Sequence, residues 1–312
     1  MEHDKLNKII QVAKLYYLLD YNQSDIAKEL GISRPTVSRL LQTAKREGIV
    51  QIKIKDQSES IEILSEKLEQ KFNLKKAIVV STPQYEDHVI KNYLGEKTAR
   101  YLEEIVQDGD TIGVTWGTTI YKVANELRET SLKDIKVVQL KGGVSHSQTH
   151  TYVSEILYLF GKAFKTMPLN LPIPVIVDHV VVKQAMEADR HIRKVLEAGK
   201  QANIAIFTCG PIEQDSLLFQ LGYFTEAELE MINSKAVGDI CSRFFDENGN
   251  ICIESLNERT LGISLSELKE KEYSILVAGG PHKINAIHGA LKGKYANVLV
   301  TDEYTAQFLL NI

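Results

Sequence analysis

Residues 24–41 read SDIAKELGISRPTVSRLL, and this stretch decides how the N-terminal part of the chain folds. Apolar residues such as Ile26 recur at helical spacing, and Gly31 allows the left-handed turn that ends a helix. Ser33 is a preferred N-cap, and Pro35 is tolerated in the first turn of the next helix because its missing N–H would have no partner there. Two short helices joined by such a turn form a helix-turn-helix.

The second helix of this motif has an apolar inner face of Val37, Leu40 and Leu41, so its polar residues point outward. An outward arginine can bond a guanine edge with two hydrogen bonds, and hydroxyl side chains suit base or phosphate contacts in the major groove. Basic and amide side chains further along the helix suit phosphates, which position the protein without reading sequence. The candidate base-reading residues are Arg34, Thr36, Ser38 and Arg39, and the candidate phosphate contacts are Gln42, Lys45 and Arg46.

A strand with alternating apolar and polar residues is predicted over residues 50–55, VQIKIK. Because it follows the recognition helix, it reads as a wing that brings Lys53 and Lys55 near the DNA backbone. With a first helix at 5–19, these elements predict a winged helix-turn-helix DNA-binding domain over residues 1–55. The alternative is an ordinary helical hairpin with a solvated basic face, but capping, turn, basic face and wing all agree with DNA binding.

The composition of the 312-residue chain is that of a folded globular protein, with 44% hydrophobic and 25% charged residues. Residues 1–55 carry ten Lys and Arg against six Asp and Glu, a net charge of +4, whereas the remainder carries −8. A basic N-terminal segment followed by an acidic remainder indicates that the N-terminal segment binds a polyanion. The sequence has neither an apolar run long enough to span a membrane nor a signal-peptide pattern, so the chain is expected to be cytoplasmic, with no membrane partner. Its three cysteines lack C-x-x-C spacing, so neither a disulfide framework nor a thiolate zinc site is expected.

The remainder of the chain, residues 56–312, predicts a second domain of the α/β class. After an amphipathic helix near residues 61–72, near-continuous Val and Ile runs alternate with helical stretches, which favours a mainly parallel sheet covered on both faces. The predicted strands are 77–81, 111–115, 135–140, 174–178, 204–209, 274–278 and 298–301, and the predicted helices lie near 88–106, 118–129, 152–166, 180–198, 225–233, 283–291 and 303–310.

Two strand ends are rich in glycine, and ligands of such folds bind beyond the carboxyl ends of the strands. Residues 113–119, GVTWGTT, and residues 277–283, VAGGPHK, each lead from a strand into a helix. Both turns aim free backbone N–H groups and a positive helix end at one point, which suits a phosphate. Glycine turns of purely structural origin are also common, but two on one sheet, one of them with Lys283, favour a phosphorylated small molecule. Neither turn has a nucleotide-binding fingerprint.

Lys141 leaves a hydrophobic strand just before Gly142 and Gly143, where a ligand and the backbone could approach each other. In that place it is either a simple cation or a partly desolvated amine that can form a Schiff base with the aldehyde of an open-chain sugar. The alternative is a loop lysine in water, which is the usual environment of lysine.

The whole chain resembles the SorC family of bacterial sugar-responsive transcription regulators. The motifs that carry the resemblance are SDIAKELGISRPTVSRLL, GVTWGTT, VVQLKGGVSHS, AVGDICSRFFDENGNIC and SILVAGGPHKINAIHGAL. The resemblance implies an effector domain similar to sugar-phosphate isomerases and a homo-oligomer that is commonly a tetramer. Such an oligomer would present paired DNA-binding domains to the half-sites of a palindromic operator. Resemblance to members that control deoxyribonucleoside uptake and breakdown implies that deoxyribose 5-phosphate is the effector and that it relieves repression.

The resemblance also implies an effector site, transferred residue by residue. Gly117, Thr118 and Thr119 match the first phosphate-contacting turn of the family, and Asp239 matches an acid that holds sugar hydroxyls. At Lys141 many members have an uncharged polar residue or arginine, so the lysine fits a ligand with a free aldehyde. The complete expected site is Gly117, Thr118, Thr119, Lys141, Gly142, Gly143, Asp239, Gly279, Gly280, His282 and Lys283, with Lys141 as the candidate for the imine.

Three other functions compete with this interpretation. An aldolase or isomerase would need an acid–base partner for the lysine, and Glu155, Asp178 and Asp239 do not resolve into a catalytic pair, so no enzyme and no catalytic residues are expected. A metal site lacks a third ligand beside His146 and His150, or beside His282 and His288, so neither a metal nor another cofactor is expected. Regulation by a different phosphosugar is the serious alternative.

Overall fold

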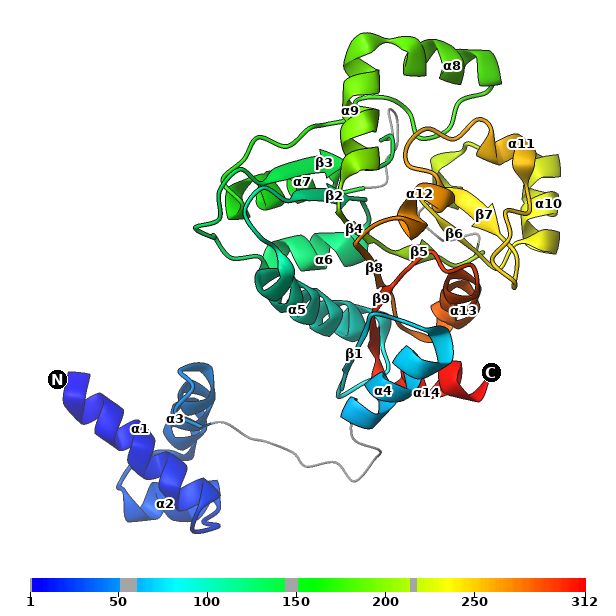
Figure 1. The fold of residues 1–312 in the computed structure, drawn as a ribbon. Coiled ribbons are helices and arrows are strands. Elements are labelled where there is room, and N and C mark those ends of the chain that lie inside the picture. Colours follow the sequence, from blue (N-terminus) through cyan, green and yellow to red (C-terminus); the bar gives the residue numbers. More distant parts are fainter. Residues whose placement is uncertain (1, 51–60, 144–150, 214–217) are drawn as a thin grey trace. The chain divides into compact units, whose positions relative to one another are not determined.

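The structure is a computed structural model that describes residues 2–50, 61–143, 151–213 and 218–312. The chain divides into two compact units, Met1–Ser58 and Glu59–Ile312 (Figure 1), and each unit is described by itself. Within the described ranges no helix is both long enough and apolar enough to cross a membrane.

In the N-terminal unit, residues 2–50 form the helices α1 (Glu2–Tyr17), α2 (Gln23–Glu29) and α3 (Arg34–Arg46). Gly31 has a φ of +62° in the turn between α2 and α3, as the sequence predicts. The Ser33 hydroxyl accepts a hydrogen bond from the Thr36 N–H at 3.3 Å, which confirms that Ser33 caps α3. The helix-turn-helix is thus built from its local sequence signals.

The core of this unit holds the inner face of α3 against α1 and α2. Val37 and Leu41 are buried together with Val12 and Ile26, whereas Leu40 is only half-buried at the edge of this cluster. The predicted wing strand, with Lys53 and Lys55, lies outside the described residues.

The C-terminal unit is organised around a six-stranded parallel sheet with the order β1-β9-β8-β4-β2-β3. This confirms the α/β class and the mainly parallel sheet. The strands of this sheet are β1 (Lys76–Val80), β2 (Thr111–Val114), β3 (Lys136–Gln139), β4 (Ile204–Phe207), β8 (Tyr273–Val277) and β9 (Val298–Asp302).

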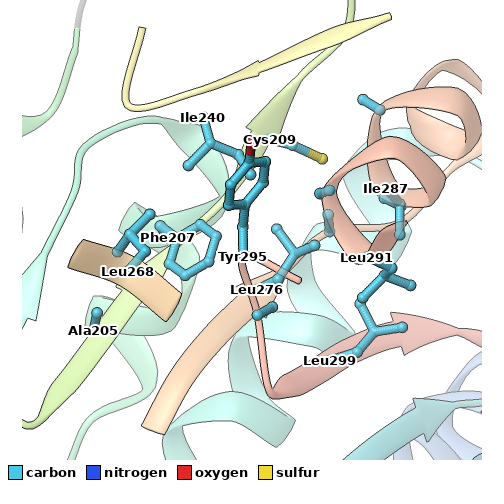
Figure 2. Packing of buried hydrophobic residues seen from close by; sticks show 14 of the residues in the cluster. Ala205, Phe207, Cys209, Ile240, Leu268, Leu276, Ile287, Leu291, Tyr295 and Leu299 are labelled. Carbon is cyan, nitrogen blue, oxygen red and sulfur yellow. The ribbon is translucent and has the colours of Figure 1, made fainter. Parts of the chain in front are cut away.

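Both faces of the sheet are covered by helices, because successive side chains of a strand point to opposite faces. On β4, Ala205 and Phe207 face one core cluster, and Ile204 and Ile206 face the other. Figure 2 shows part of the first cluster, in which the Phe207 ring lies beside Leu268. The first face is covered mainly by α4 (Ile61–Phe72), α13 (Ile284–Lys292) and α14 (Glu303–Asn311), and the second by α5 (Asp87–Ile105), α6 (Thr118–Glu126) and α7 (Val153–Ala163).

A small antiparallel sheet, with the order β5-β6-β7, is the main feature that the sequence did not predict. Its strands are β5 (Cys209–Gly210), β6 (Gly238–Ile240) and β7 (Arg243–Phe245). The remaining elements are α8 (Val180–Ala188), α9 (Arg190–Gln201), α10 (Glu226–Lys235), α11 (Glu254–Asn257), α12 (Leu265–Lys269) and the 3-10 helices η1 (Phe219–Leu221) and η2 (Pro281–Lys283).

Two predictions about local structure were wrong. Residues 174–178 do not form a strand, because this apolar run makes only isolated bridges, from Pro174 to Gly143 and from Ile176 to Thr260. The single helix predicted at 180–198 is two helices, because Asp189 ends α8 and its carboxylate caps α9 by accepting from the His191 N–H at 2.8 Å.

Candidate functional site

The site lies where the strand order of the large sheet reverses. From β2 the chain continues through α6 to β3 on one side, whereas from β4 it later reaches β8 on the other side. Helices that leave neighbouring strands in opposite directions open a crevice at the carboxyl ends of those strands. Residues that follow β2, β3, β4 and β8 therefore meet at one edge of the sheet.

A cavity of about 480 Å³ occupies this edge. Its size is typical of a site for a small ligand. All of the expected effector-binding residues line it except two glycines. The expected residues that line the cavity are Gly117, Thr118, Thr119, Lys141, Asp239, Gly279, Gly280, His282 and Lys283.

The two glycines that do not line the cavity are Gly142 and Gly143. A Cβ on Gly142 would lie 2.7 Å from the Ile173 carbonyl oxygen, so this glycine lets two backbone segments approach each other. Gly143 bridges to Pro174 and lines a separate cavity at the start of α7. The pair therefore positions the strand end that carries Lys141 instead of facing this cavity.

The N-terminus of α6 faces the cavity through Gly117, Thr118 and Thr119. Gly117 has a φ of +130°, and a Cβ there would meet nothing within 4 Å. No side chain in the described ranges caps this end of α6. The first N–H groups of a helix have no partner within the helix and carry its positive dipole end, so this turn suits an anion.

The second glycine turn differs from the sequence expectation. The Gly280 N–H is not free, because it donates to Asp302 Oδ2 and Thr305 Oγ1, both at 2.9 Å. A Cβ on Gly279 would collide with the same Asp302 carboxylate. The buried acid at the start of α14 thus holds this turn and orients the residues that follow it, including Lys283.

Lys283 is the basic residue at the end of this turn, and it is half-buried. Its Nζ donates to Thr208 Oγ1 at 3.3 Å. Burial lowers the pKa of Lys283. The neighbouring Cys209 and Asp87 act to raise this pKa, whereas Lys91 acts to lower it further. Lys283 therefore shares its end of the cavity with Lys91 and Asp87.

Lys141 is 7% exposed, so the expectation of a desolvated amine is favoured over that of a loop lysine in water. Its Nζ lies 3.6 Å from the centroid of the Trp116 ring, and the Trp116 Nε1–H donates to the Gly142 carbonyl at 2.8 Å. Burial lowers the pKa of Lys141, and the negative charge of Asp239 opposes this effect. The amine is therefore closer to its neutral, nucleophilic form than a surface lysine.

Asp239 comes from the small sheet, on the hairpin of β6 and β7. Its Oδ2 accepts from the Ser242 N–H at 3.0 Å, and its other oxygen packs against Gly210, where a Cβ would not fit. Cys241 and Ser242 form the hairpin turn with φ values of +54° and +64°, an unusual conformation for residues other than glycine. Burial raises the pKa of Asp239, and Lys141 opposes this effect most strongly.

Several lining residues were missed by sequence reasoning. Asp87 and Lys91 form an ion pair at the start of α5, and His282 Nδ1 lies 2.9 Å from Glu213 Oε1. Thr208, which was predicted to lie within the strand 204–209, and Gly210, just beyond that strand, also line the cavity. The i,i+4 spacing of Asp87 and Lys91 is a signal in the sequence, but it is common on helix surfaces. The cavity thus combines three lysines, one buried acid and a helix N-terminus, a set that can bind an anionic polyol and attack an aldehyde.

Metal binding finds no support among the described residues, which contain no group of three or more His, Cys, Asp or Glu arranged to hold an ion. His146 and His150 lie outside these residues. His288 packs edge-on against the Phe72 ring, with the ring centroids 6.1 Å apart. This histidine is therefore part of the contact between α13 and α4.

The candidate DNA-reading face is the outer side of α3. Arg34, Arg39 and Gln42 are exposed, and Thr36 and Ser38 are half-buried. The Thr36 hydroxyl lies 2.8 Å from the Ser33 hydroxyl, so part of its hydrogen-bonding capacity is used at the cap. Lys45 and Arg46 are exposed in the last turn of α3.

Comparisons with known proteins cover both units. A family model described as a sugar-binding domain matches residues 56–311, and a Crp-like helix-turn-helix model matches residues 9–69. The chain is 51% identical over 311 residues to a deoxyribonucleoside regulator of Bacillus subtilis, covering 100% of this chain and 99% of that protein. It is 32% identical over 311 residues to the sorbitol operon regulator of Klebsiella pneumoniae, covering 98% of each.

A solved structure agrees with these sequence matches. The crystal structure of the full-length sorbitol operon regulator SorC of Klebsiella pneumoniae superimposes with a TM-score of 0.77 at 31% identity, covering 98% of both chains. These full-length relatives are transcriptional regulators. Because these matches cover both the helix-turn-helix and the domain with the parallel sheet, the chain is a DNA-binding transcriptional regulator of the sugar-binding SorC family.

Proposed function

We propose that this regulator is a repressor whose operator binding is relieved by deoxyribose 5-phosphate, and that it controls genes for deoxyribonucleoside uptake and catabolism in the cytoplasm. The observation that carries the proposal is the position of Lys141, a buried amine in the same cavity as Lys283 and the α6 N-terminus. A sugar phosphate with a free aldehyde offers a partner to each of these groups. The 51% identity to a deoxyribonucleoside regulator supports this choice of sugar.

The ligand is assigned along the cavity by its chemistry. The phosphate binds at Thr118, Thr119 and Lys283, where helix N–H groups and an ammonium meet. The Asp239 carboxylate accepts hydrogen bonds from sugar hydroxyls. The neutral Lys141 amine adds to the aldehyde carbon, the two amine protons pass to the carbonyl oxygen, and this oxygen leaves as water while the C=N bond forms.

Coupling to DNA requires two arrangements of the protein. A homo-oligomer, which we take to be a tetramer, presents paired α3 helices to the two halves of a palindromic operator. The effector favours an arrangement in which these helices no longer match the half-sites, and linkage then requires that it weakens DNA binding. A typical coupling free energy of about 1–3 kcal/mol corresponds to an affinity change of about 5- to 150-fold.

The decisive experiment measures operator affinity of the full-length protein, on a site selected from random DNA, with and without each candidate sugar. Deoxyribose 5-phosphate should weaken binding within the range given above, whereas unphosphorylated deoxyribose and inorganic phosphate should have a much smaller effect. A larger effect from another phosphosugar would assign the regulator to that sugar, and no effect from any phosphosugar would contradict the proposal.

An enzymatic role is less well supported by the geometry. Of the three acids considered as partners of the lysine, only Asp239 lines the cavity, whereas Glu155 lines a different cavity at the start of α7. Asp239 is assigned to the sugar hydroxyls, and the relatives that match the whole chain are regulators, which supports a stable Schiff base over a turnover intermediate. We therefore propose that the protein is not an enzyme, and steady turnover of deoxyribose 5-phosphate by the purified protein would contradict this.

A further inference from the structure

The Asp87–Lys91 ion pair lies at the cavity, although neither residue has been assigned a role. Asp87 is the first residue of α5 and Lys91 lies one turn later, with Lys91 Nζ 2.5 Å from Asp87 Oδ2. Both line the cavity, and the Lys91 side chain is 20% exposed. α5 packs closely on α6, since a Cβ on Gly95 would lie 2.8 Å from the Lys122 carbonyl carbon. This pair therefore borders the end of the cavity where α6 begins.

Each of the three carboxylates that line the cavity, Asp87 with Lys91 among them, has a partner in the part of the chain that the structure describes. Asp239 accepts a hydrogen bond from the Ser242 N–H, and the positive charge of Lys141 acts to lower its pKa. Glu213 Oε1 lies 2.9 Å from His282 Nδ1. Lys283 donates to the Thr208 hydroxyl, with Lys91 and Asp87 close enough to act on its charge. Asp239 acts on the charge of Lys283 as well, but among the described residues no carboxylate forms an ion pair with Lys283, so its ammonium can take an anionic ligand.

We propose that Asp87 and the effector compete for Lys91. In the ligand-free protein the Asp87 carboxylate binds the Lys91 ammonium, and when the effector binds, its phosphate dianion displaces Asp87 from Lys91. The phosphate is then bound by Lys91 and Lys283 together. This inference rests on the proposed function and adds to it the residues that select for phosphate charge.

The selection follows from the charges involved. A phosphate monoester carries about −1.5 to −2 at neutral pH and has three acceptor oxygens, so it can displace a single carboxylate from an ammonium. A neutral sugar hydroxyl cannot, because it would have to separate the Asp87–Lys91 pair without offering a charge in return. Below the second phosphate pKa of about 6, the monoanion loses most of this advantage.

The test uses the full-length protein with Asp87→Asn, Lys91→Gln and Lys91→Arg, and measures dissociation constants for deoxyribose 5-phosphate and inorganic phosphate by calorimetry. Lys91→Gln should weaken binding of both probes about tenfold or more, because a charge-assisted hydrogen bond is lost. Lys91→Arg should restore most of the affinity. Asp87→Asn should tighten binding of both probes several-fold and reduce the preference for dianion over monoanion across pH 5–7.

Matched controls lie two turns along the same helix. Arg100 and Glu96 form an exposed ion pair with the same i,i+4 spacing, and neither lines the cavity. Arg100→Gln and Glu96→Gln change the net charge of the protein as Lys91→Gln and Asp87→Asn do, and both should bind the probes like the wild type. Thermal melting of every variant checks that the domain folds.

The outcomes separate this inference from the proposed function. If the wild type binds deoxyribose 5-phosphate and Lys91→Gln binds it equally well, the role of Lys91 is wrong while the proposed function stands. If the wild type prefers a different phosphosugar but the variants change phosphate affinity as expected, the role of Lys91 stands and the proposed effector is wrong. A wild type that binds neither probe would overturn both.

Discussion

Lys141 Nζ lies 3.6 Å from the centre of the Trp116 ring, and both side chains are almost completely buried. The ring face attracts the ammonium, and the Trp116 hydrogen bond to the Gly142 carbonyl fixes the indole in this orientation. The indole thus holds the amine at the cavity wall, and Asp239 is the carboxylate that acts on its charge. An amine held in this way remains available for a carbonyl compound.

Reduction of an imine at Lys141 should depend on pH. Because burial lowers the pKa of Lys141, its neutral fraction rises at lower pH than that of an exposed lysine. Borohydride trapping with deoxyribose 5-phosphate should therefore increase with pH, with a midpoint below the ordinary lysine value of about 10.4. Intact-protein mass spectrometry across a pH series measures the adduct, and peptide mapping locates it.

Lys141→Arg is the matched control for trapping, since it keeps a cation but cannot form the imine. It should yield no adduct at position 141 at any pH. An equal adduct yield on this variant, or no adduct on the wild type, would contradict the assignment.

Asp239→Asn should shift the trapping profile. The carboxylate raises the pKa of Lys141, so its removal lets that pKa fall further and moves the midpoint of trapping to lower pH. The asparagine carbonyl can still accept from the Ser242 N–H, so the hairpin should be retained. The measurement is the same pH series, and a midpoint that stays in place or moves upward would show that the two groups are not coupled.

Gly117→Ala should impair effector binding. The φ of +130° and ψ of 169° fall in a region that is essentially restricted to glycine, so an alanine there costs about 1–3 kcal/mol or shifts the turn. Either result displaces the α6 N–H groups from the phosphate, and we expect affinity for deoxyribose 5-phosphate to fall more than tenfold.

Gly109→Ala is the control for this backbone effect. Gly109 is exposed, has a φ of +87° and lies outside the lining of the cavity. Its variant should lower the melting temperature but keep the affinity for the sugar phosphate. Equal affinity losses in both variants would mean that strain alone explains the Gly117 result.

Arg39→Ala and Lys45→Ala should differ in their effects on DNA. Arg39 is exposed on the outer face of α3, so its loss should lower the ratio of specific to random binding by about 1–3 kcal/mol at one operator position. Lys45→Ala should weaken binding to all sequences about equally and reduce the salt slope by about one. Gel-shift titrations on operator and scrambled DNA at several salt concentrations measure both. An unchanged ratio for Arg39→Ala would place the reading face elsewhere.

The parts of the fold that could be predicted are those with a local signal. Ser33 and Gly31 mark the helix-turn-helix through capping and a left-handed turn. The run IAIF at Ile204–Phe207 is apolar throughout because β4 is buried on both faces. These features are readable because each residue type has one dominant structural use.

The parts that were missed depend on tertiary contacts. The β6–β7 hairpin turns at Cys241 and Ser242, without the glycine or asparagine that usually marks such a turn, so the sequence gives no local sign of it. The run at Pro174–Asp178 has the composition of a strand, but it pairs only through isolated bridges. Composition reports burial, and burial alone does not distinguish a strand from an extended segment.

The candidate site was predictable only where its residues follow a local sequence signal. Lys141 and Lys283 stand at strand ends, where any doubly covered sheet places its ligands. Asp87 and Lys91 look like an ordinary surface pair, and only the packing of α5 on α6 brings them to the cavity. Asp239 was recognised only from the family resemblance, because its strand was not predicted at all.

The residues that line the cavity extend along the chain from Asp87 to Lys283. A chain truncated before residue 283 would therefore lack part of the cavity lining and should not bind the proposed effector. Binding of the effector should increase the free energy of unfolding of the domain by about 2.7 kcal/mol when the ligand concentration is a hundred times the dissociation constant. Proteolysis of the purified chain should therefore slow in the same proportion when the proposed effector is added.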